Sequence, residues 1–405
     1  QAQPVLEDAL ALARRELGDH HIATAEAHLA LGELMVGAGN AADGRGHLEI
    51  AASSMRRLGD RRQEVNAMRW TAIALANMGK RDEAVALVTD AARLAEQLPA
   101  ADKRTRMMSQ QNLSDLRLVD RIAPARRAYA LAREIHGDRP SVDVLLARSQ
   151  WAYALVFEGD ARVGLSELRA LLPDQIALLG STHTEVVGTH GRIANAAIAT
   201  GDPWTAIDSA QRGRELLLSR ASGPDTEYVG RLSLVLGTAL LSARRFEEAR
   251  SELARATAVL SRHVPADHPV LRVAISAQAM AQTRLGQLDE AEALTQKLQA
   301  NAVSDPAREG ALIRLRRGLL RSAQGRHEEA LDLLQEAEAY FATDPRRVEH
   351  ARALAALGEA RVAAGGARGP LGAVRLPGGR GAALRQHRPL GAQRKLLQLD
   401  QRRDG

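Results

Sequence analysis

The chain of 405 residues contains no cysteine, few aromatic residues and no long apolar run. The lack of cysteine excludes disulfides and thiolate metal sites and is compatible with a reducing compartment, so we expect a cytoplasmic protein. No stretch approaches the roughly 20 apolar residues of a membrane-spanning helix, and no signal peptide is present in this sequence. Aromatic residues make up only 2% of the chain. Its wealth of alanine, leucine and arginine instead predicts an all-α protein packed through small side chains.

A turn that mostly contains glycine recurs every 39 to 43 residues. A small residue lies seven positions before nearly every turn, as at Gly32, Gly237 and Gly318, and another lies five positions after it. A period of this length is typical of stacked helical hairpins, so we predict an α-solenoid of about nine hairpins. The turns fall at Gly39, Gly79, Asp120, Gly159, Gly201, Arg244, Gly286, Gly325 and Gly365.

Acidic pairs follow several of these turns, as at Asp82 and Glu83 or at Glu328 and Glu329. In the first turn of a helix each carboxylate interacts favourably with the helix dipole, by about 0.3 to 1 kcal/mol. Adjacent residues of a helix point in different directions, and the pairs recur with the turn. We therefore interpret them as helix-start residues and not as catalytic acids and bases.

The histidines of the connecting segments do not form a metal site in this interpretation. His20, His21, His183 and His268 lie in equivalent segments of different units, whereas zinc needs ligands that converge at about 2.0 to 2.3 Å. The segment GDARVGLS lacks the lysine of a phosphate-binding loop, and no G-x-S-x-G motif occurs. We predict no catalytic residue, no cofactor, no metal and no small-molecule substrate, and hence a protein that is not an enzyme.

The basic character of the chain comes from its end. The net charge is +6, but residues 366–405 alone carry +7, from eight arginines and Lys395 against Asp400 and Asp404. The remaining residues are close to neutral. Nucleic-acid binding through the basic tail is therefore the alternative function and not the preferred one.

The repeat pattern covers residues 1–364 and is followed by a tail at 365–405 that is rich in glycine, arginine and proline. Such a segment cannot hold a helix or bury a core. It is either a disordered basic tail or an end read out of frame, and we prefer the second because acidic residues vanish abruptly there. Residues 1–17 have the pattern of a second helix whose first helix is missing, so we expect the chain to be a piece of a longer protein.

The pattern of a small residue, a turn and a second small residue resembles the tetratricopeptide repeat. Leucine precedes the first small residue in LALGELM and LVLGTAL. Connecting segments such as LGDHHIATA and VPADHPVLR are similar to those of the longer repeats in kinesin light chains and bacterial signalling proteins. The resemblance implies a right-handed superhelix that binds proteins or peptides. It also suggests the recognition segment of a larger signalling protein, such as a serine/threonine kinase, although no kinase motif occurs in these residues.

The resemblance places the first helix of each unit on the concave side of the superhelix. The positions ten, nine, six and three residues before the turns are polar and basic there, and the paired asparagines of the long-repeat family are absent. We expect an acidic partner segment, because arginine pairs well with carboxylates. Ordinary solvated helix surface is the alternative, and self-association through uncapped ends stays open. The expected partner-binding residues are Arg69, Trp70, Gln110, Gln111, Arg117, Gln150, Tyr153, Arg192, Asn195 and Arg316.

Overall fold

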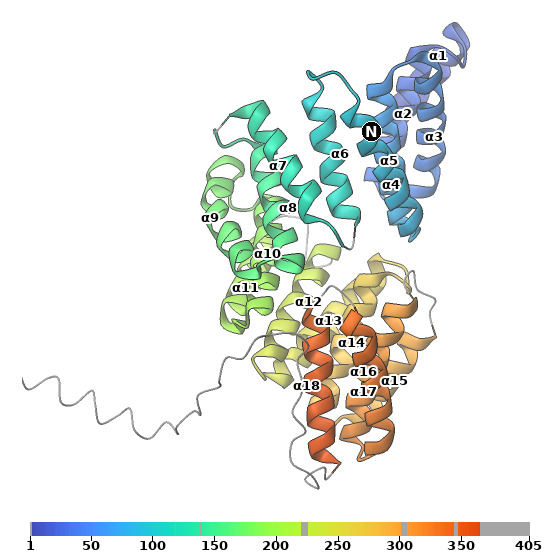
Figure 1. Cartoon of the computed structure of the whole chain (residues 1–405). Helices are drawn as coiled ribbons and strands as arrows, with labels where there is room; N and C mark the ends of the chain where they lie inside the picture. Colours follow the sequence, from blue (N-terminus) through green and yellow to red (C-terminus); the bar gives the residue numbers. More distant parts are fainter. Residues whose placement is uncertain are drawn as a thin grey trace, which may run out of the picture. The chain divides into compact units, whose positions relative to one another are not determined.

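The computed structural model describes residues 2–117, 119–137, 139–219, 226–300, 306–343 and 347–364. These residues form 18 α-helices and no strand (Figure 1), which confirms the predicted all-α solenoid. Among the described helices, none is long and apolar enough to cross a membrane. The turn at Gly365 and the tail at 365–405 lie outside the described residues, so the expectations for them stay predictions.

The helices alternate as first and second members of hairpins. The first helices are α2 (Ile22–Gly37), α4 (Arg61–Asn77), α6 (Lys103–Leu116), α8 (Val142–Glu158), α10 (Thr184–Thr200), α12 (Glu227–Ser242), α14 (Pro269–Arg284) and α16 (Pro306–Ala323). The second helices are α3 (Ala41–Leu58), α5 (Arg81–Glu96), α7 (Ile122–His136), α9 (Ala161–Leu179), α11 (Pro203–Leu218), α13 (Phe246–His263), α15 (Leu288–Gln299) and α17 (His327–Thr343). Helix α1 (Ala2–Leu17) precedes these hairpins and α18 (Arg347–Ala363) follows them.

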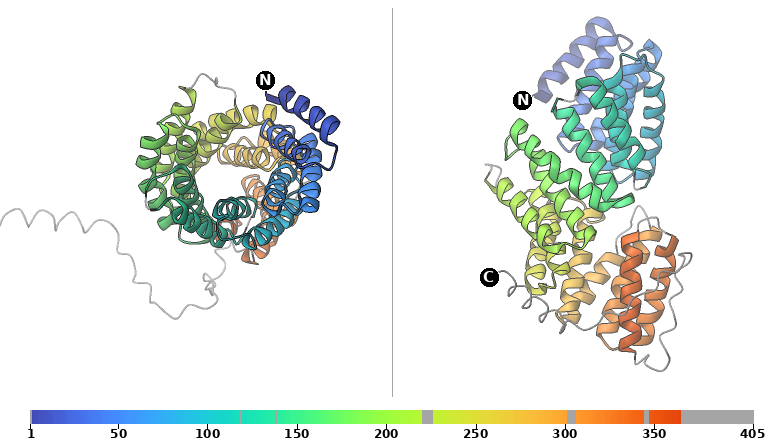
Figure 2. Two further views of the ribbon diagram at one scale, coloured as in Figure 1. Left: turned by 90° about the horizontal axis from the view of Figure 1, so that it is seen from above. Right: turned by 60° about the vertical axis from the view of Figure 1, so that its left-hand side comes forward.

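Successive first helices pack against one another throughout the array. Each helix contacts the next along the chain, and each first helix also contacts the first helix of the following unit, from α2 on α4 to α16 on α18. Over the described part of the chain, consecutive second helices show no comparable packing. The first helices therefore lie closer together, and the stack of hairpins curves with the first helices on its inner side (Figure 2).

The small residues before the turns let the two helices of a hairpin approach closely. A Cβ atom on Gly237 would lie 2.5 Å from Cγ of Leu253, and one on Gly32 would lie 2.6 Å from Cγ of Leu48. Both leucines are fully buried. The leucine of the second helix thus occupies the space that a side chain on the first helix would need.

The turns that set the period share a left-handed backbone conformation. Glycine adopts this conformation without the steric strain of a Cβ atom. Its φ angle lies between 76° and 92° at Gly39, Gly79, Gly201, Gly286 and Gly325. Asp120 and Arg244, which stand where the pattern has glycine, adopt the same conformation with φ of 57° and 60°. The turn geometry is therefore kept even where the sequence departs from glycine, whereas Gly159 is an exception with φ of −127°.

Three of the histidines in the connecting segments cap helices. His21, His183 and His268 are the N-cap residues of α2, α10 and α14, and each ring Nδ1 accepts a hydrogen bond of 3.2 Å from a backbone N–H two residues later. This is the helix-start role expected from their recurrence with the repeat. Within the described ranges, no group of three or more histidine, aspartate or glutamate side chains could hold a metal ion.

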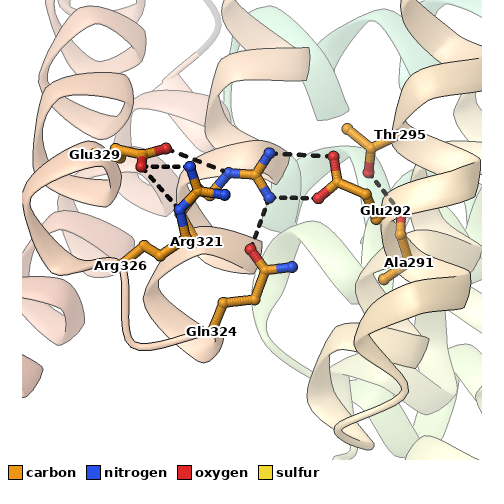
Figure 3. A network of polar contacts seen from close by, with 7 residues as sticks. All are labelled: Ala291, Glu292, Thr295, Arg321, Gln324, Arg326 and Glu329. Atoms are coloured by element: carbon orange, nitrogen blue, oxygen red, sulfur yellow. Dashed lines mark hydrogen bonds and ion pairs between the residues drawn. The ribbon is translucent and has the colours of Figure 1, made fainter.

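An ion-pair network joins α15, α16 and α17 (Figure 3). Arg321 of α16 is only 7% exposed, and its guanidinium binds Glu292 of α15 and donates a 2.7 Å hydrogen bond to Gln324. Glu329 of α17 lies 3.6 Å from the same guanidinium and also accepts a 2.8 Å hydrogen bond from Arg326. The hydrogen bonds from Arg321 lower the pKa of Glu292. Because a buried arginine needs its carboxylate partners, the network holds two neighbouring units together.

We expect Gly237→Ala to destabilise the fold by about 1 to 3 kcal/mol, because the added methyl group would overlap with Leu253. Gly46→Ala is the matched control, since a Cβ atom at this helical glycine meets nothing within 4 Å. The control should be neutral or stabilising by up to about 1 kcal/mol. Urea unfolding followed by circular dichroism measures both. Equal effects of the two substitutions would contradict the close approach.

Arg244→Gly should stabilise the fold by about 0.5 to 1 kcal/mol, because it relieves the strain of a side chain in the left-handed conformation. The Arg244 side chain is exposed and makes no polar contact with the other described residues, while the backbone N–H donates a 3.1 Å hydrogen bond to the Leu241 carbonyl that glycine would keep, so the change acts mainly on the backbone. The reciprocal substitution Gly286→Arg should lower stability, since its φ is 76°. Thermal unfolding compares the variants, and a lower melting temperature for Arg244→Gly would refute the expectation.

Candidate functional site

Polar side chains of consecutive first helices are hydrogen-bonded to one another on the inner side of the array. The side chain nine positions before the turn bridges to the preceding first helix. Arg192 Nη1 of α10 donates to Ser149 Oγ of α8 at 3.0 Å. Gln150 Nε2 of α8 donates to Asp115 Oδ2 of α6 at 2.8 Å. The bridges recur from unit to unit because the inner helices lie side by side.

The same position bridges two other pairs of units. Trp70 of α4 interacts with the carboxylate of Glu33 on α2 and favours its charged form. Arg316 of α16 donates to Ser276 Oγ of α14 at 3.0 Å. Part of the predicted site therefore also holds the inner helices together. These side chains have a structural role whether or not they bind a ligand.

The richest part of this surface spans three helices, and we call it the central cluster. Tyr153 is at its middle: its OH accepts a 3.1 Å hydrogen bond from Asn195 Nδ2, and its ring packs edge-on against Phe157 at 4.9 Å between centroids. The guanidinium carbon of Arg192 lies 6.0 Å from the Tyr153 ring centroid. The cluster consists of Asp115 on α6, of Ser149, Gln150, Tyr153 and Phe157 on α8, and of Glu185, Arg192 and Asn195 on α10.

Asp115 has the most perturbed carboxyl group of the central cluster. Water reaches this side chain, but protein surrounds it on the inner side of the array and raises its pKa to about 6. Arg192 and Arg121 act in the opposite direction, and Glu185 adds to the rise. Burial likewise raises the pKa of Tyr153. The cluster is thus accessible to a ligand, and the protein around it strengthens electrostatic contacts made within it.

The central cluster offers both charge signs together with donors, acceptors and aromatic faces. Arg192 lies 3.4 Å from Glu185 Oε2, so its charge is partly balanced within the cluster. Gln150 Oε1 is buried without a hydrogen-bond partner. Phe157 is 42% exposed and available to an apolar side chain. This arrangement suits a peptide, whose backbone amides and mixed side chains need all these contacts, better than it suits a chemical reaction.

Of the residues expected from the sequence, the structure brings Gln150, Tyr153, Arg192 and Asn195 together in the central cluster. The sequence pattern does not predict Asp115, Glu185 and Phe157, because they lie outside the positions ten, nine, six and three residues before the turns. The carboxylates of Asp115 and Glu185 make this part of the inner surface mixed in charge. The positions predicted from the repeat pattern indicate a basic surface instead.

The remaining expected residues lie elsewhere. Arg69 is only 4% exposed and donates hydrogen bonds to Asn112 Oδ1 at 2.8 Å and Asn66 Oδ1 at 3.0 Å. Burial lowers the pKa of Arg69 to about 10. Gln110 is turned toward Glu96 of α5, with a 3.1 Å hydrogen bond. Gln111 of α6 and Arg117, the C-cap residue of that helix, are both half-buried. Their roles in partner binding stay predictions.

Trp70 borders a separate open depression of about 610 Å³ near the start of the described chain. Glu33 also lines it, and burial raises the pKa of this carboxyl group. The other lining residues are Leu6, Ala30, Leu34, Gly37 and Ala38. This end of the inner surface therefore favours an apolar or basic side chain.

The carboxyl group of Asp115 should titrate near pH 6 in the folded protein, above its ordinary value of 3.8. The folded state then holds the proton more tightly than the unfolded chain, so Asp115 makes the free energy of unfolding fall as the pH rises from about 4 to about 6. Arg192→Gln should raise this pKa further, because the guanidinium favours the carboxylate. The ¹³C shift of labelled aspartate carboxyl groups measures the titration, with Asp115→Asn as the assignment control. A midpoint near 4 would contradict the prediction.

Neither a protein-family profile nor a curated protein sequence matches the chain. Solved structures do match. A Rap protein complexed with Competence and Sporulation Factor has a TM-score of 0.53 at 11% identity, over 84% of this chain and 98% of that one. Apo RapI matches with a TM-score of 0.48 at 9% identity, over 84% and 97% of the chains.

A kinesin light chain protein of Podosopora anserina with nearly identical TPR-like repeats matches with a TM-score of 0.42 at 20% identity. This match covers 50% of the present chain and 96% of the other. At 11% identity the likeness to the Rap protein concerns the fold alone, and it agrees with the hairpins and the stacking of the inner helices. By its fold, the chain is a tetratricopeptide-like helical repeat protein.

Proposed function

We propose that the chain is a non-catalytic scaffold that binds a partner protein or an extended peptide along its inner helices. The central cluster carries this proposal, because three successive first helices present amide, carboxylate, guanidinium and aromatic groups on one surface. The Rap protein, which shares the fold at a TM-score of 0.53, is complexed with Competence and Sporulation Factor in its solved structure. That precedent supports the proposal.

The chemistry of the central cluster suggests how a peptide would bind. Gln150 and Asn195 carry side-chain amides that suit the backbone of an extended segment. Arg192 would pair with an acidic side chain, in exchange for its 3.4 Å contact with Glu185. Tyr153 and Phe157 would hold an apolar side chain, since aromatic residues contribute much of the energy of protein interfaces.

We also propose, from the resemblance of the connecting segments, that the chain serves as the recognition segment of a larger bacterial signalling protein of the cytoplasm, such as a serine/threonine kinase. Val5 and Leu12 of α1 are 66% and 51% exposed, which supports self-association as an additional proposal. The alternative of nucleic-acid binding depends on the basic tail, which lies outside the described residues.

Site-specific photo-crosslinking in the native host tests the proposal. We expect p-benzoylphenylalanine at Phe157 to capture a partner protein, because this aromatic side chain lies in the central cluster. The matched control is the same amino acid at Trp204, an aromatic residue of α11 that is 64% exposed and belongs to a second helix. Mass spectrometry identifies the adducts.

Arg192→Glu should reduce the yield of the Phe157 adduct by about tenfold, since it reverses a charge at the centre of the surface. Arg69 is less suitable for such a test, because its burial means that charge reversal would also disturb the fold. Adducts of equal yield at Trp204, or none at Phe157, would sink the proposal.

A further inference from the structure

A cavity of about 280 Å³ lies among the first helices α12, α14, α16 and α18, and single residues of α13 and α15 complete its wall. We call it the arginine pocket, because five arginines line it. What it can bind depends on which of their charges other groups of the protein already balance. The five are Arg272, Arg284, Arg308, Arg316 and Arg352.

Two of the five arginines have a carboxylate of their own. Arg272 of α14 pairs with Glu309 of α16 at 2.7 Å. Arg284 of α14 pairs with Glu359 of α18 at 3.1 Å. These two guanidinium groups therefore add no unbalanced charge to the pocket.

Glu349 of α18 lies between two further arginines, 3.8 Å from Arg308 and 3.7 Å from Arg352. Arg308 makes another interaction as well, so we count no unbalanced charge for it. Arg352 has no hydrogen bond to the other described residues, and its side chain is 42% exposed. Its N–H donors are therefore open to a ligand, although Glu349 balances its charge in part.

Arg316 of α16 has no carboxylate within ion-pair distance among the described residues. Its Nε donates to Ser276 Oγ at 3.0 Å and its Nη1 to Met280 Sδ at 3.2 Å, both uncharged acceptors. Its Nη2 has no acceptor in the described part of the chain and is reached by solvent. The pocket thus has one unbalanced positive charge, on a guanidinium that a ligand can approach.

The two open guanidinium groups repel one another. Burial lowers the pKa of Arg316 to about 10, and Arg352 is the charged neighbour with the largest effect, in the same direction. Glu349 opposes this effect and Arg284 adds to it. An anion between Arg316 and Arg352 relieves their repulsion, and the attraction is strong because little water screens charges at a buried guanidinium.

Part of the lining of the arginine pocket is apolar. Phe246 contributes an aromatic ring, and Val273, Leu312 and Ile313 contribute aliphatic surface. The volume of about 280 Å³ is at the lower end for ligand pockets, which typically measure about 300 to 1,000 Å³, so a small molecule fills it. A ligand with an anionic head and an apolar body makes use of both parts of the lining.

We infer that the arginine pocket binds a small monocarboxylic acid with an aromatic or aliphatic body, whose carboxylate lies between Arg316 and Arg352. One unbalanced charge suits a monoanion. A carboxylate has two oxygens, so it accepts hydrogen bonds from both guanidinium groups at once. This inference goes beyond the proposed function, because it requires no partner protein.

Isothermal titration of the whole chain with three matched probes tests the inference. 3-Phenylpropionate carries a carboxylate and an aromatic ring. 3-Phenylpropionamide has the same body without the charge, and acetate has the charge without the body. We expect saturable binding of 3-phenylpropionate that is at least about tenfold tighter than the binding of either other probe.

Arg352→Gln should weaken the binding of 3-phenylpropionate by about tenfold, since the amide keeps a donor but removes the charge. The exposure of the Arg352 side chain means that this change leaves the core intact. Arg361→Gln is the matched control, because Arg361 is an exposed arginine of the same helix that does not line the pocket.

Arg316→Gln should weaken the binding at least as much, since it removes the unbalanced charge. Its matched control is Arg314→Gln: Arg314 lies on the same helix, pairs with Glu336 of α17 at 2.8 Å and does not line the pocket. Circular dichroism checks that the variants fold.

N-acetyl-alanyl-phenylalanine carries the same ring and carboxylate at the end of a peptide chain. We expect it to bind more weakly than 3-phenylpropionate, because the cavity is small. Tighter binding of the dipeptide would overturn the assignment to a small acid and indicate the chain end of a protein instead. Absence of saturable binding by 3-phenylpropionate, equal binding of its amide, or unchanged binding in both pocket variants would refute the site itself. None of these results bears on the crosslinking at Phe157, so the two proposals fail separately.

Discussion

The close approach of two helices at a residue with little or no side chain is the constraint on which this structure depends. Where Gly237 faces Leu253 and Gly318 faces Leu334, the second helix inserts a leucine into space that any Cβ atom would fill. The two helices of the hairpin therefore come closest to each other at this contact. Repeated from unit to unit, this contact sets how each hairpin presents its first helix to the next, and so leads to a curved stack with the first helices inside.

The inner surface follows from that curvature. Because first helices lie against one another, a long polar side chain on one helix reaches the preceding helix, as Arg192 reaches Ser149 and Arg316 reaches Ser276. These contacts hold neighbouring units together and at the same time concentrate polar groups where protein limits their hydration. The central cluster is an outcome of this arrangement.

The fold could be predicted from the sequence to a large extent, since its signals are local. Helical spacing, glycine at a left-handed turn and acidic residues in the first turn of a helix each involve residues that are near one another in the chain. Even Asp120 and Arg244 were placed at turns by the period alone, and both adopt the left-handed conformation. The candidate site was predicted less well. Arg69 has the same position in its unit as inner residues but is buried against Asn112. The position of Asp115 is not among those that the repeat pattern predicts, although its pKa is raised to about 6.

The sequence by itself determined that this protein is an array of helical hairpins, because the period and the turn recur in each unit and the small residue in nearly all of them. Only the tertiary structure decided which polar groups meet. Asp115, Gln150 and Arg192 come from three different units, and Arg272 meets Glu309 across 37 residues of chain. Whether a guanidinium finds a carboxylate depends on the curvature of the stack and on the direction of each side chain, which no local pattern encodes. The charge balance of the inner surface, and with it the choice of ligand, is therefore a property of the folded array.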